Sequence, residues 1–342
     1  MAPTYGMLPS GAGAVPAETS PCPGTLSELE WQQLLKPIED GKCTAFLGAG
    51  VDQGSLPLGR DLAQRWAKEF GYPLADSGDL QRVSQYLSLL TANRGLPKQQ
   101  MYDLVREAKP PDFTDPTSPL GVLADLPIPI YLTTNYDDFM LRALRTRKRD
   151  AKVEVCGWWK PRVENFAIVY NEPDFSSPSA AGNVQVTGFA RSRFKSRNFV
   201  PTAASPVVYH LHGHYELLES MVLTEDDYLD FLVNMSRDQN LIPPVIQQAL
   251  TGCALLFMGY SLADYDFKVL FRSLIYPLAR SHRITVSIQL PQSQESEALE
   301  YLNRYYKDMA IAVYWGKAES FAKELSERWA KRQSGVQPTH VP

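Results

Sequence analysis

Four short motifs in the sequence combine residue types that can bind a phosphate, hold a sugar or move a proton. They are GAG at Gly48, Ala49 and Gly50, TTNYD at 133–137, HLHGH at 210–214 and GYSLAD at 259–264. Each motif directly follows a short apolar segment with the composition of a buried strand. Ligands of open α/β sheets bind beyond the carboxyl ends of the strands, so each motif is a candidate ligand-binding segment.

The two glycines of the GAG motif leave the backbone without side chains at positions 48 and 50. Glycine lets the chain approach a pyrophosphate without a Cβ clash, and exposed N–H groups can hold its oxygens. The motif differs from both G-x-G-x-x-G and the Walker loop. A second GAG string at 11–13 has no strand ahead of it, so it carries no such prediction.

The TTNYD and GYSLAD motifs each allow a functional and a structural interpretation. Asn135 and Asp137 can contact a ligand, but Asp137 can also simply cap the helix that follows. Gly259 permits a turn, Ser261 offers a hydroxyl, and Asp264 can bind a ribose or cap the next helix. The fourth motif is therefore either part of a site or a plain strand-to-helix connection.

Three of the five histidines in the chain fall within residues 210–214. Alternation places them on one face of an extended chain, which raises the hypothesis of a metal cluster. However, Gly213 is expected to end the strand and to turn His214 away, and no carboxylate stands at a ligand-like spacing. We therefore expect no metal. A single histidine as a base or a ribose contact fits better, because imidazole titrates near neutrality.

Short apolar segments alternate with helical patterns along most of the chain. Strands are expected at 43–47, 128–133, 207–211, 254–258, 284–288 and 311–314. Capping boxes predict helix starts at Thr25 with Glu28 and at Thr224 with Asp227, and another helix is expected over 264–278. This alternation predicts an α/β fold, a Rossmann-like parallel sheet with helices on both faces.

The domain organisation is expected to be a mobile tail at 1–24 and one domain at 25–335. Residues 147–206 break the alternation and are interpreted as an inserted small subdomain. Its basic residues are Arg147, Lys148, Arg149, Arg191, Arg193, Lys195 and Arg197. They either contact nucleic acid or a partner, or form a solvated face with scattered charge.

Composition excludes several classes of protein. The 342 residues carry 34 Lys and Arg against 38 Asp and Glu, a net charge of −4, which argues against a polybasic nucleic-acid binder. No apolar run approaches the roughly 20 residues that span a bilayer. The start of the chain does not resemble a secretory signal, and the four cysteines form no C-x-x-C pair. We expect a reduced, cytoplasmic, globular protein.

The order of the four motifs resembles that of the sirtuins, whose G-A-G, T-Q-N-I-D, H-G and G-T-S-L motifs line an NAD pocket. The similarity extends over about 42–288. It implies that Asn135 holds the ribose and positions a water, and that His212 contacts the ribose hydroxyls and acts as general base. The remaining assignments that it implies are Asp137 to the nicotinamide carboxamide, Gly48, Ala49 and Gly50 to the pyrophosphate, Gly259, Ser261 and Asp264 to the adenosine half, and Asp52 and Thr133 to the same pocket.

The sequence departs from the sirtuins in three places. The two C-x-x-C pairs of the sirtuin zinc module are absent, the basic insert stands in their place, and residues 51–57 replace the sirtuin cofactor loop. The zinc module helps to form the groove for an acyl-lysine peptide, so its loss argues against deacylation. What remains resembles the zinc-free sirtuin-like NAD hydrolases of bacterial anti-phage systems.

That resemblance implies an NAD glycohydrolase that acts as effector in abortive infection. The alternatives are an NAD-dependent protein deacylase or ADP-ribosyltransferase, and a non-catalytic module that senses NAD or ADP-ribose. An NADase must be gated, so we expect a homo-oligomer. The chain has no recognisable sensor domain, so we also expect a separate sensor subunit such as an ATPase or an Argonaute-like protein.

Overall fold

The computed structural model describes residues 26–90, 94–160, 165–172, 184–195, 199–238, 241–260, 284–290 and 296–335. Three sequence expectations lie outside these residues: the tail at 1–24, the helix over 264–278, and the side chains of Ser261 and Asp264. Among the helices that the structure describes, none has the length and apolar character needed to cross a membrane.

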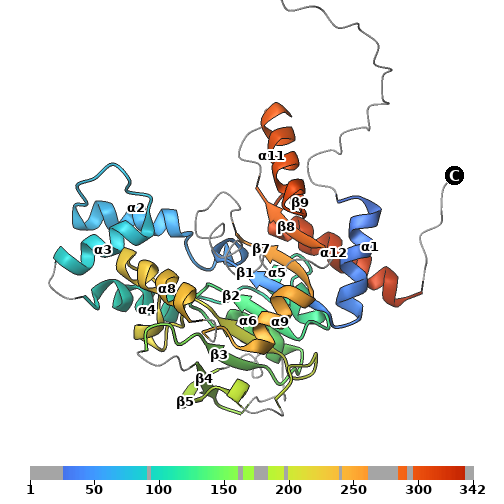
Figure 1. Ribbon diagram of the computed structural model, residues 1–342, viewed down its shortest axis with the longest axis horizontal. Coiled ribbons are helices and arrows are strands. Elements are labelled where there is room, and N and C mark those ends of the chain that lie inside the picture. Colours follow the sequence, from blue (N-terminus) through green and yellow to red (C-terminus); the bar gives the residue numbers. More distant parts are fainter. Residues whose placement is uncertain are drawn as a thin grey trace, which may run out of the picture.

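Nine strands of the described chain join into one sheet. They are β1 Cys43–Leu47, β2 Ile130–Thr133, β3 Lys152–Val155, β4 Phe166–Tyr170, β5 Val186–Arg191, β6 Val207–His210, β7 Ala254–Met258, β8 Thr285–Gln289 and β9 Ile311–Trp315. Their order is β5-β4-β3-β6-β2-β1-β7-β8-β9 (Figure 1). All neighbours from β3 to β9 are parallel, whereas β4 is antiparallel to β3 and β5.

The central strands are apolar along their whole length because both faces of the sheet are covered. Every residue of β1 and β7 is buried. Ala45 and Leu47 of β1 belong to the hydrophobic core on one face, and Phe46 belongs to the core on the other. This is the pattern of a parallel sheet in a doubly wound fold, and it confirms the predicted α/β class.

Helices cover the two faces in separate groups. Helices α1 Glu28–Glu39, α5 Pro119–Asp125, α6 Phe139–Thr146 and α12 Ala318–Gln333 contribute to the core of one face. Helices α8 Glu225–Arg237, α9 Pro244–Gly252 and α11 Ser296–Asp308 contribute to the core of the other. Trp31 of α1 and Phe321 of α12 stack with ring centroids 5.3 Å apart, which joins the first and last described helices.

A third hydrophobic cluster forms a helical unit apart from the two faces. It consists of α2 Gly59–Phe70, α3 Leu80–Leu90 and α4 Leu96–Glu107, which follow the β1 turn in the chain. Leu62, Val83 and Met101 of these helices share the cluster with Met221 and Leu223, which follow β6. Figure 1 shows this unit beside α8, on the left of the view. The unit is thereby fixed to the chain that leaves the carboxyl end of β6.

Two helix starts test the capping-box predictions. Thr224 and Asp227 form the predicted box at the start of α8, so this prediction is confirmed. The box of α1 uses Ser27 and Glu30, not Thr25 and Glu28, so the expected start is wrong by two residues. Leu26, immediately before the Ser27 cap, is buried in the core, and such a residue commonly fixes the entry of the chain into a helix.

The described part of residues 147–206 does not fold as a separate layer. Its strands β3, β4 and β5 continue the central sheet beyond β6. Arg147 pairs with Asp125 at 2.6 Å, and Arg193 pairs with the buried Glu154 at 3.2 Å. Arg149 is buried and donates to main-chain oxygens, among them that of Ile128 at 2.6 Å. Three of the basic side chains considered for nucleic-acid contact therefore bind other groups of the same chain, and of these Arg149 is buried.

Candidate active site

The turns that follow β1 and β7 pack directly against each other. The N–H of Gly48 donates to the Met258 carbonyl at 2.9 Å, and the N–H of Gly50 donates to the Gly259 carbonyl at 2.9 Å. Gly259 has a left-handed φ of +77°, and a Cβ there would lie 2.3 Å from the Val51 nitrogen. The first and fourth sequence motifs thus form one interlocked unit.

This contact explains why glycine is needed at positions 48 and 50 even without a ligand. A Cβ at Gly48 would lie 2.7 Å from the Gly259 carbonyl oxygen, and one at Gly50 would lie 3.0 Å from the Gly259 Cα. Because both N–H groups already donate to main-chain carbonyls, neither is offered to a pyrophosphate in this conformation. Ala49 is the residue of this motif that lines the cavity described below.

The loop after β2 brings Asn135 to the glycine turn. Thr133 is buried, and its hydroxyl donates to the Leu47 carbonyl at 3.2 Å and accepts from the N–H of Asn135 at 2.9 Å. The Asn135 side-chain amide donates to the Gly48 carbonyl at 3.2 Å. Thr133 therefore has a structural part in shaping the loop, and Asn135 places its polar side chain between the first and second motifs.

Asp137 is buried at the start of α6. One of its carboxylate oxygens accepts a hydrogen bond from the N–H of Phe139 at 2.9 Å. The cap position of α6 is occupied by Asp138, whose side chain makes no capping hydrogen bond, so Asp137 shapes the turn one residue before the cap. Asp137 also lines the cavity, which fits the ligand-contact interpretation.

The three clustered histidines do not share one face, and this expectation is wrong. Strand β6 ends at His210, so alternation does not extend to residue 214. The rings of His210 and His214 lie 4.8 Å apart, whereas the ring of His212 packs on Phe231 at 4.9 Å. His214 is thus not turned away from His210. Within the residues that the structure describes, no three His, Cys, Asp or Glu side chains are grouped so that they could hold a metal ion.

His212 presents a buried, neutral imidazole. Its side chain is 8% exposed, and its Nε2 has no hydrogen-bond partner among the described residues. Burial lowers its pKa from the ordinary 6.5 to about 4, so the ring is uncharged at neutral pH. Nε2 is thus a buried polar atom that the described residues leave unbonded.

A cavity of about 220 Å³ brings four motifs together. Its lining includes the predicted residues Ala49, Asn135, Asp137, His212 and Gly259. Gly48, Gly50 and Thr133 lie behind it, in the contacts given above. Asp52 is at the end of the short 3-10 turn Ala49–Asp52, and its side chain lies outside the part of the chain that the structure describes. The convergence of residues that are far apart in the sequence makes this cavity the candidate active site.

Sequence reasoning missed two other parts of the cavity. Leu56, Pro57, Leu62, Leu80, Met101, Leu104 and Val105 form an apolar wall that comes from α2, α3, α4 and the segment before them. Tyr260 also lines the cavity, and its hydroxyl lies 2.5 Å from that of Thr134. Tyr260 stands inside the GYSLAD motif, so its place after a strand was a signal. Nothing in the sequence pairs it with Thr134.

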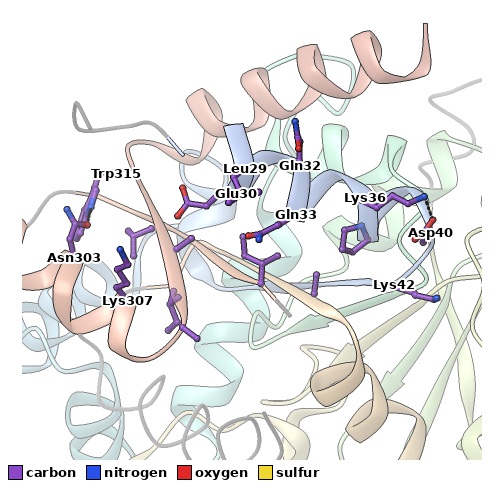
Figure 2. Close-up of a pocket in the computed structure, with 17 residues that line it drawn as sticks. Leu29, Glu30, Gln32, Gln33, Lys36, Asp40, Lys42, Asn303, Lys307 and Trp315 are labelled. Atoms are coloured by element: carbon purple, nitrogen blue, oxygen red, sulfur yellow. Dashed lines mark hydrogen bonds and ion pairs between the residues drawn. The ribbon is translucent and has the colours of Figure 1, made fainter. Parts of the chain in front are cut away.

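A larger cavity lies elsewhere and does not contain the motifs. It measures about 980 Å³ and lies between α1, α11 and the edge of the sheet (Figure 2). Lys42 precedes β1, Ala254 begins β7 and Ile311 begins β9, so much of its lining is at the amino ends of strands. Ligands of open α/β sheets bind at the opposite ends, and none of the predicted site residues that the structure describes lines this cavity. The smaller cavity is therefore the better candidate.

Comparison with known proteins identifies the family. Residues 129–313, more than half of the chain, match the family model of the SIR2-like domain. The chain belongs to the SIR2-like domain family. The match includes the TTNYD, HLHGH and GYSLAD motifs but begins after Gly50. The interlocked turns connect the earlier glycine motif to this matched part.

Several curated proteins are distantly similar to this SIR2-like chain. The NAD(+) hydrolase ThsA of Acinetobacter baumannii is 23% identical over 236 residues, which are 68% of this chain and 39% of ThsA. ThsA of Bacillus cereus is 26% identical over 69% of this chain and 40% of its own length. Defense-associated sirtuin 2 of Bacillus subtilis is 24% identical over 70% of this chain and 20% of its own length. The chain thus spans well under half of these relatives.

Proposed function

We propose that this SIR2-like protein is an NAD glycohydrolase that cleaves NAD into nicotinamide and ADP-ribose. The observation that carries the proposal is that Asn135 and His212, from the ends of β2 and β6, line one cavity. His212 there is neutral and has an unbonded Nε2. The similarity to NAD(+) hydrolases called ThsA supports it, at 22–26% identity.

The reaction breaks the bond between the nicotinamide nitrogen and C1′ of the ribose, through a transition state that resembles an oxocarbenium ion. The bonding electron pair leaves with nicotinamide, and water attacks C1′. His212 accepts the proton of that water, which an uncharged imidazole can do at neutral pH. The Asn135 amide exchanges its hydrogen bond with Gly48 for one with the ribose or the water.

The rest of the cavity assists this chemistry. The apolar wall from Leu56 to Val105 limits the access of bulk water to the reacting centre. Asp137 holds the nicotinamide carboxamide through the carboxylate oxygen that does not accept from the Phe139 N–H. The cavity volume of about 220 Å³ is below the roughly 300–1,000 Å³ of ordinary ligand sites. The described residues therefore enclose only part of a dinucleotide in this conformation.

We further propose that the enzyme is an effector of anti-phage defence and that its activity is gated by assembly. A relative named defense-associated sirtuin supports the first part, and the harm that unrestrained NAD hydrolysis would do to the host supports the second. The proposed assembly is a homo-oligomer with a separate sensor subunit, such as an ATPase or an Argonaute-like protein. Light scattering at micromolar concentration tests it, and a strict monomer with full NAD turnover would contradict it.

The activity itself is tested by chromatography of NAD incubated with pure protein, alone and with candidate partners. Free nicotinamide and ADP-ribose are expected. Release of nicotinamide only with a peptide or an acceptor protein would indicate a deacylase or an ADP-ribosyltransferase instead. Binding of NAD without any cleavage would indicate a sensor module. Gln33→Ala, an exposed change in the larger cavity, serves as a control that should leave turnover unchanged.

A further inference from the structure

Directly beside Asn135 lies a second histidine that the proposed mechanism does not use. His210, the last residue of β6, is 1% exposed, and its Nδ1 lies 3.0 Å from the main-chain oxygen of Asn135. A carbonyl oxygen can only accept, so Nδ1 carries the hydrogen and Nε2 does not. Nε2 has no hydrogen-bond partner among the described residues. His210 therefore makes its hydrogen bond with the Asn135 loop.

The third histidine of the motif, His214, packs against the ring of His210. The Nδ1 of His214 accepts from the N–H of Glu216 at 3.2 Å, so its hydrogen is on Nε2, which donates to the Tyr170 hydroxyl at 2.9 Å. The rings of His210 and His214 meet edge to face, 4.8 Å apart and at 80°. Burial keeps both rings uncharged, because it lowers both pKa values, that of His210 to about 4.

Tyr170 brings the insert into this arrangement. It belongs to β4, and the guanidinium of Arg145 lies 5.6 Å from the centre of its ring. The same guanidinium donates to the main-chain oxygen of Asn171 at 3.0 Å. Contacts thus run from β4 through Tyr170, His214 and His210 to the backbone of Asn135.

Both peptide groups that flank the Asn135 Cα are held in place. The N–H on one side donates to the Thr133 hydroxyl at 2.9 Å, and the carbonyl on the other side accepts from His210 at 3.0 Å. Fixing these two groups restricts rotation about both backbone bonds of the residue, and so fixes the direction in which its side chain leaves the chain. Displacement of a reacting group by about 1 Å can cost on the order of 100-fold in rate.

We propose that His210 is a positioning residue for the reaction: its Nδ1–H holds the carbonyl of Asn135 so that the side-chain amide points at the ribose. His214, which contacts the imidazole ring of His210, and Tyr170, which bonds His214, keep that ring in its orientation. The inference rests on the proposed NAD cleavage. It assigns a function to the first histidine of the HLHGH motif and to the insert strand β4, neither of which contributes a side chain to the cavity lining.

Two substitutions at this position separate positioning from the filling of space. His210→Asn keeps an N–H close to the place of Nδ1, because the asparagine amide nitrogen and Nδ1 are both attached to Cγ. His210→Leu fills a similar volume and has no donor. For His210→Leu we expect kcat to fall on the order of 10- to 100-fold. KM should stay within about twofold, since the lost interaction acts on the transition state.

His210→Asn should recover most of the lost kcat, although it loses the ring contact with His214. Tyr170→Phe, which removes the acceptor of the His214 Nε2–H, should lower kcat by a smaller factor in the same direction. Circular dichroism and thermal melting of each variant report the folded fraction, so that rates are compared per folded molecule. The steady-state rates are measured by release of nicotinamide from NAD.

The outcomes distinguish this inference from the proposed function. A wild-type protein that releases no nicotinamide under any condition overturns both. A wild type that cleaves NAD, with His210→Leu equal to it, overturns only the positioning proposal. Equal kcat losses in His210→Leu and His210→Asn also overturn it, because a purely structural histidine would give that result. A loss in His210→Leu that His210→Asn repairs supports it.

Discussion

The contact between the β1 and β7 turns makes Gly259→Ala a severe substitution. Gly259 has a φ of +77°, and the added Cβ would lie 2.3 Å from the Val51 nitrogen and 2.5 Å from the Gly48 oxygen. Both neighbours are backbone atoms, so no side chain can rotate away. One of the two turns must move, and with it the carbonyl that the Asn135 amide contacts.

The loss of unfolding free energy expected for Gly259→Ala is the sum of two separate costs. A left-handed conformation costs an alanine about 1–2 kcal/mol, and forcing atoms into a packed region typically adds about 1–3 kcal/mol. Gly71 provides the matched control, because its φ is +69° and an added Cβ would meet nothing within 4 Å. Gly71→Ala should therefore show only the first cost, and Gly259→Ala should show both.

The assay is urea unfolding of both variants beside wild type, followed by NAD turnover of the folded proteins. We expect Gly259→Ala to lose about 2–5 kcal/mol of unfolding free energy and most of its activity. Gly71→Ala should lose about 1–2 kcal/mol and remain active. Equal destabilisation by the two substitutions would refute the packing argument, and a fully active Gly259→Ala would refute the link to Asn135.

Three further predictions concern pH, a buried arginine and metal. His210 and His212 are neutral in the folded protein because burial lowers their pKa values to about 4, whereas in the unfolded chain they take up protons below about pH 6.5. Their contribution to the free energy of unfolding should therefore be full above pH 6.5 and should fall by about 3 kcal/mol for each histidine as the pH drops towards 4. Unfolding measured at stepped pH tests this. A protein equally stable at pH 7 and pH 4.5 would contradict this. Arg149 donates to four main-chain carbonyls and the Tyr131 hydroxyl. Arg149→Met should therefore lower the free energy of unfolding in urea by about 3 kcal/mol, whereas the exposed control Arg191→Ala should change it very little. Similar losses in both variants would contradict this. Exhaustive chelation should leave NAD cleavage unchanged, and loss of activity with recovery on adding zinc would show that a metal is required.

The strands that carry the motifs are predictable because burial on both faces makes them apolar throughout. Residues 43–47 and 254–258 coincide with β1 and β7 for this reason. The last strand of the insert lacks this signal. In β5 Val186–Arg191 no residue is buried, so neither a continuous apolar run nor a sharp alternation marks it. Its place in the sheet depends on pairing with β4, which the local sequence does not encode.

The candidate site is predictable as a set of segments but not as a set of contacts. The motif order indicates Asn135 and His212, and both line the cavity. Alternation alone does not separate His210 from His212, because both fit it until the strand ends at His210. Only the resemblance to the sirtuin H-G motif indicates His212. The partners of the insert's arginines were hidden for a similar reason. Glu154 and Arg193 are 39 residues apart, and only the fold brings them together.

The central claim is that Asn135 and His212 act together on the glycosidic bond of NAD. The most direct test is nicotinamide release from NAD by purified wild type, Asn135→Ala, His212→Ala and Gln33→Ala, each shown to be folded by circular dichroism. We predict cleavage by wild type and by Gln33→Ala, with both site variants at least about 100-fold slower. Wild-type turnover in either folded site variant would contradict the account.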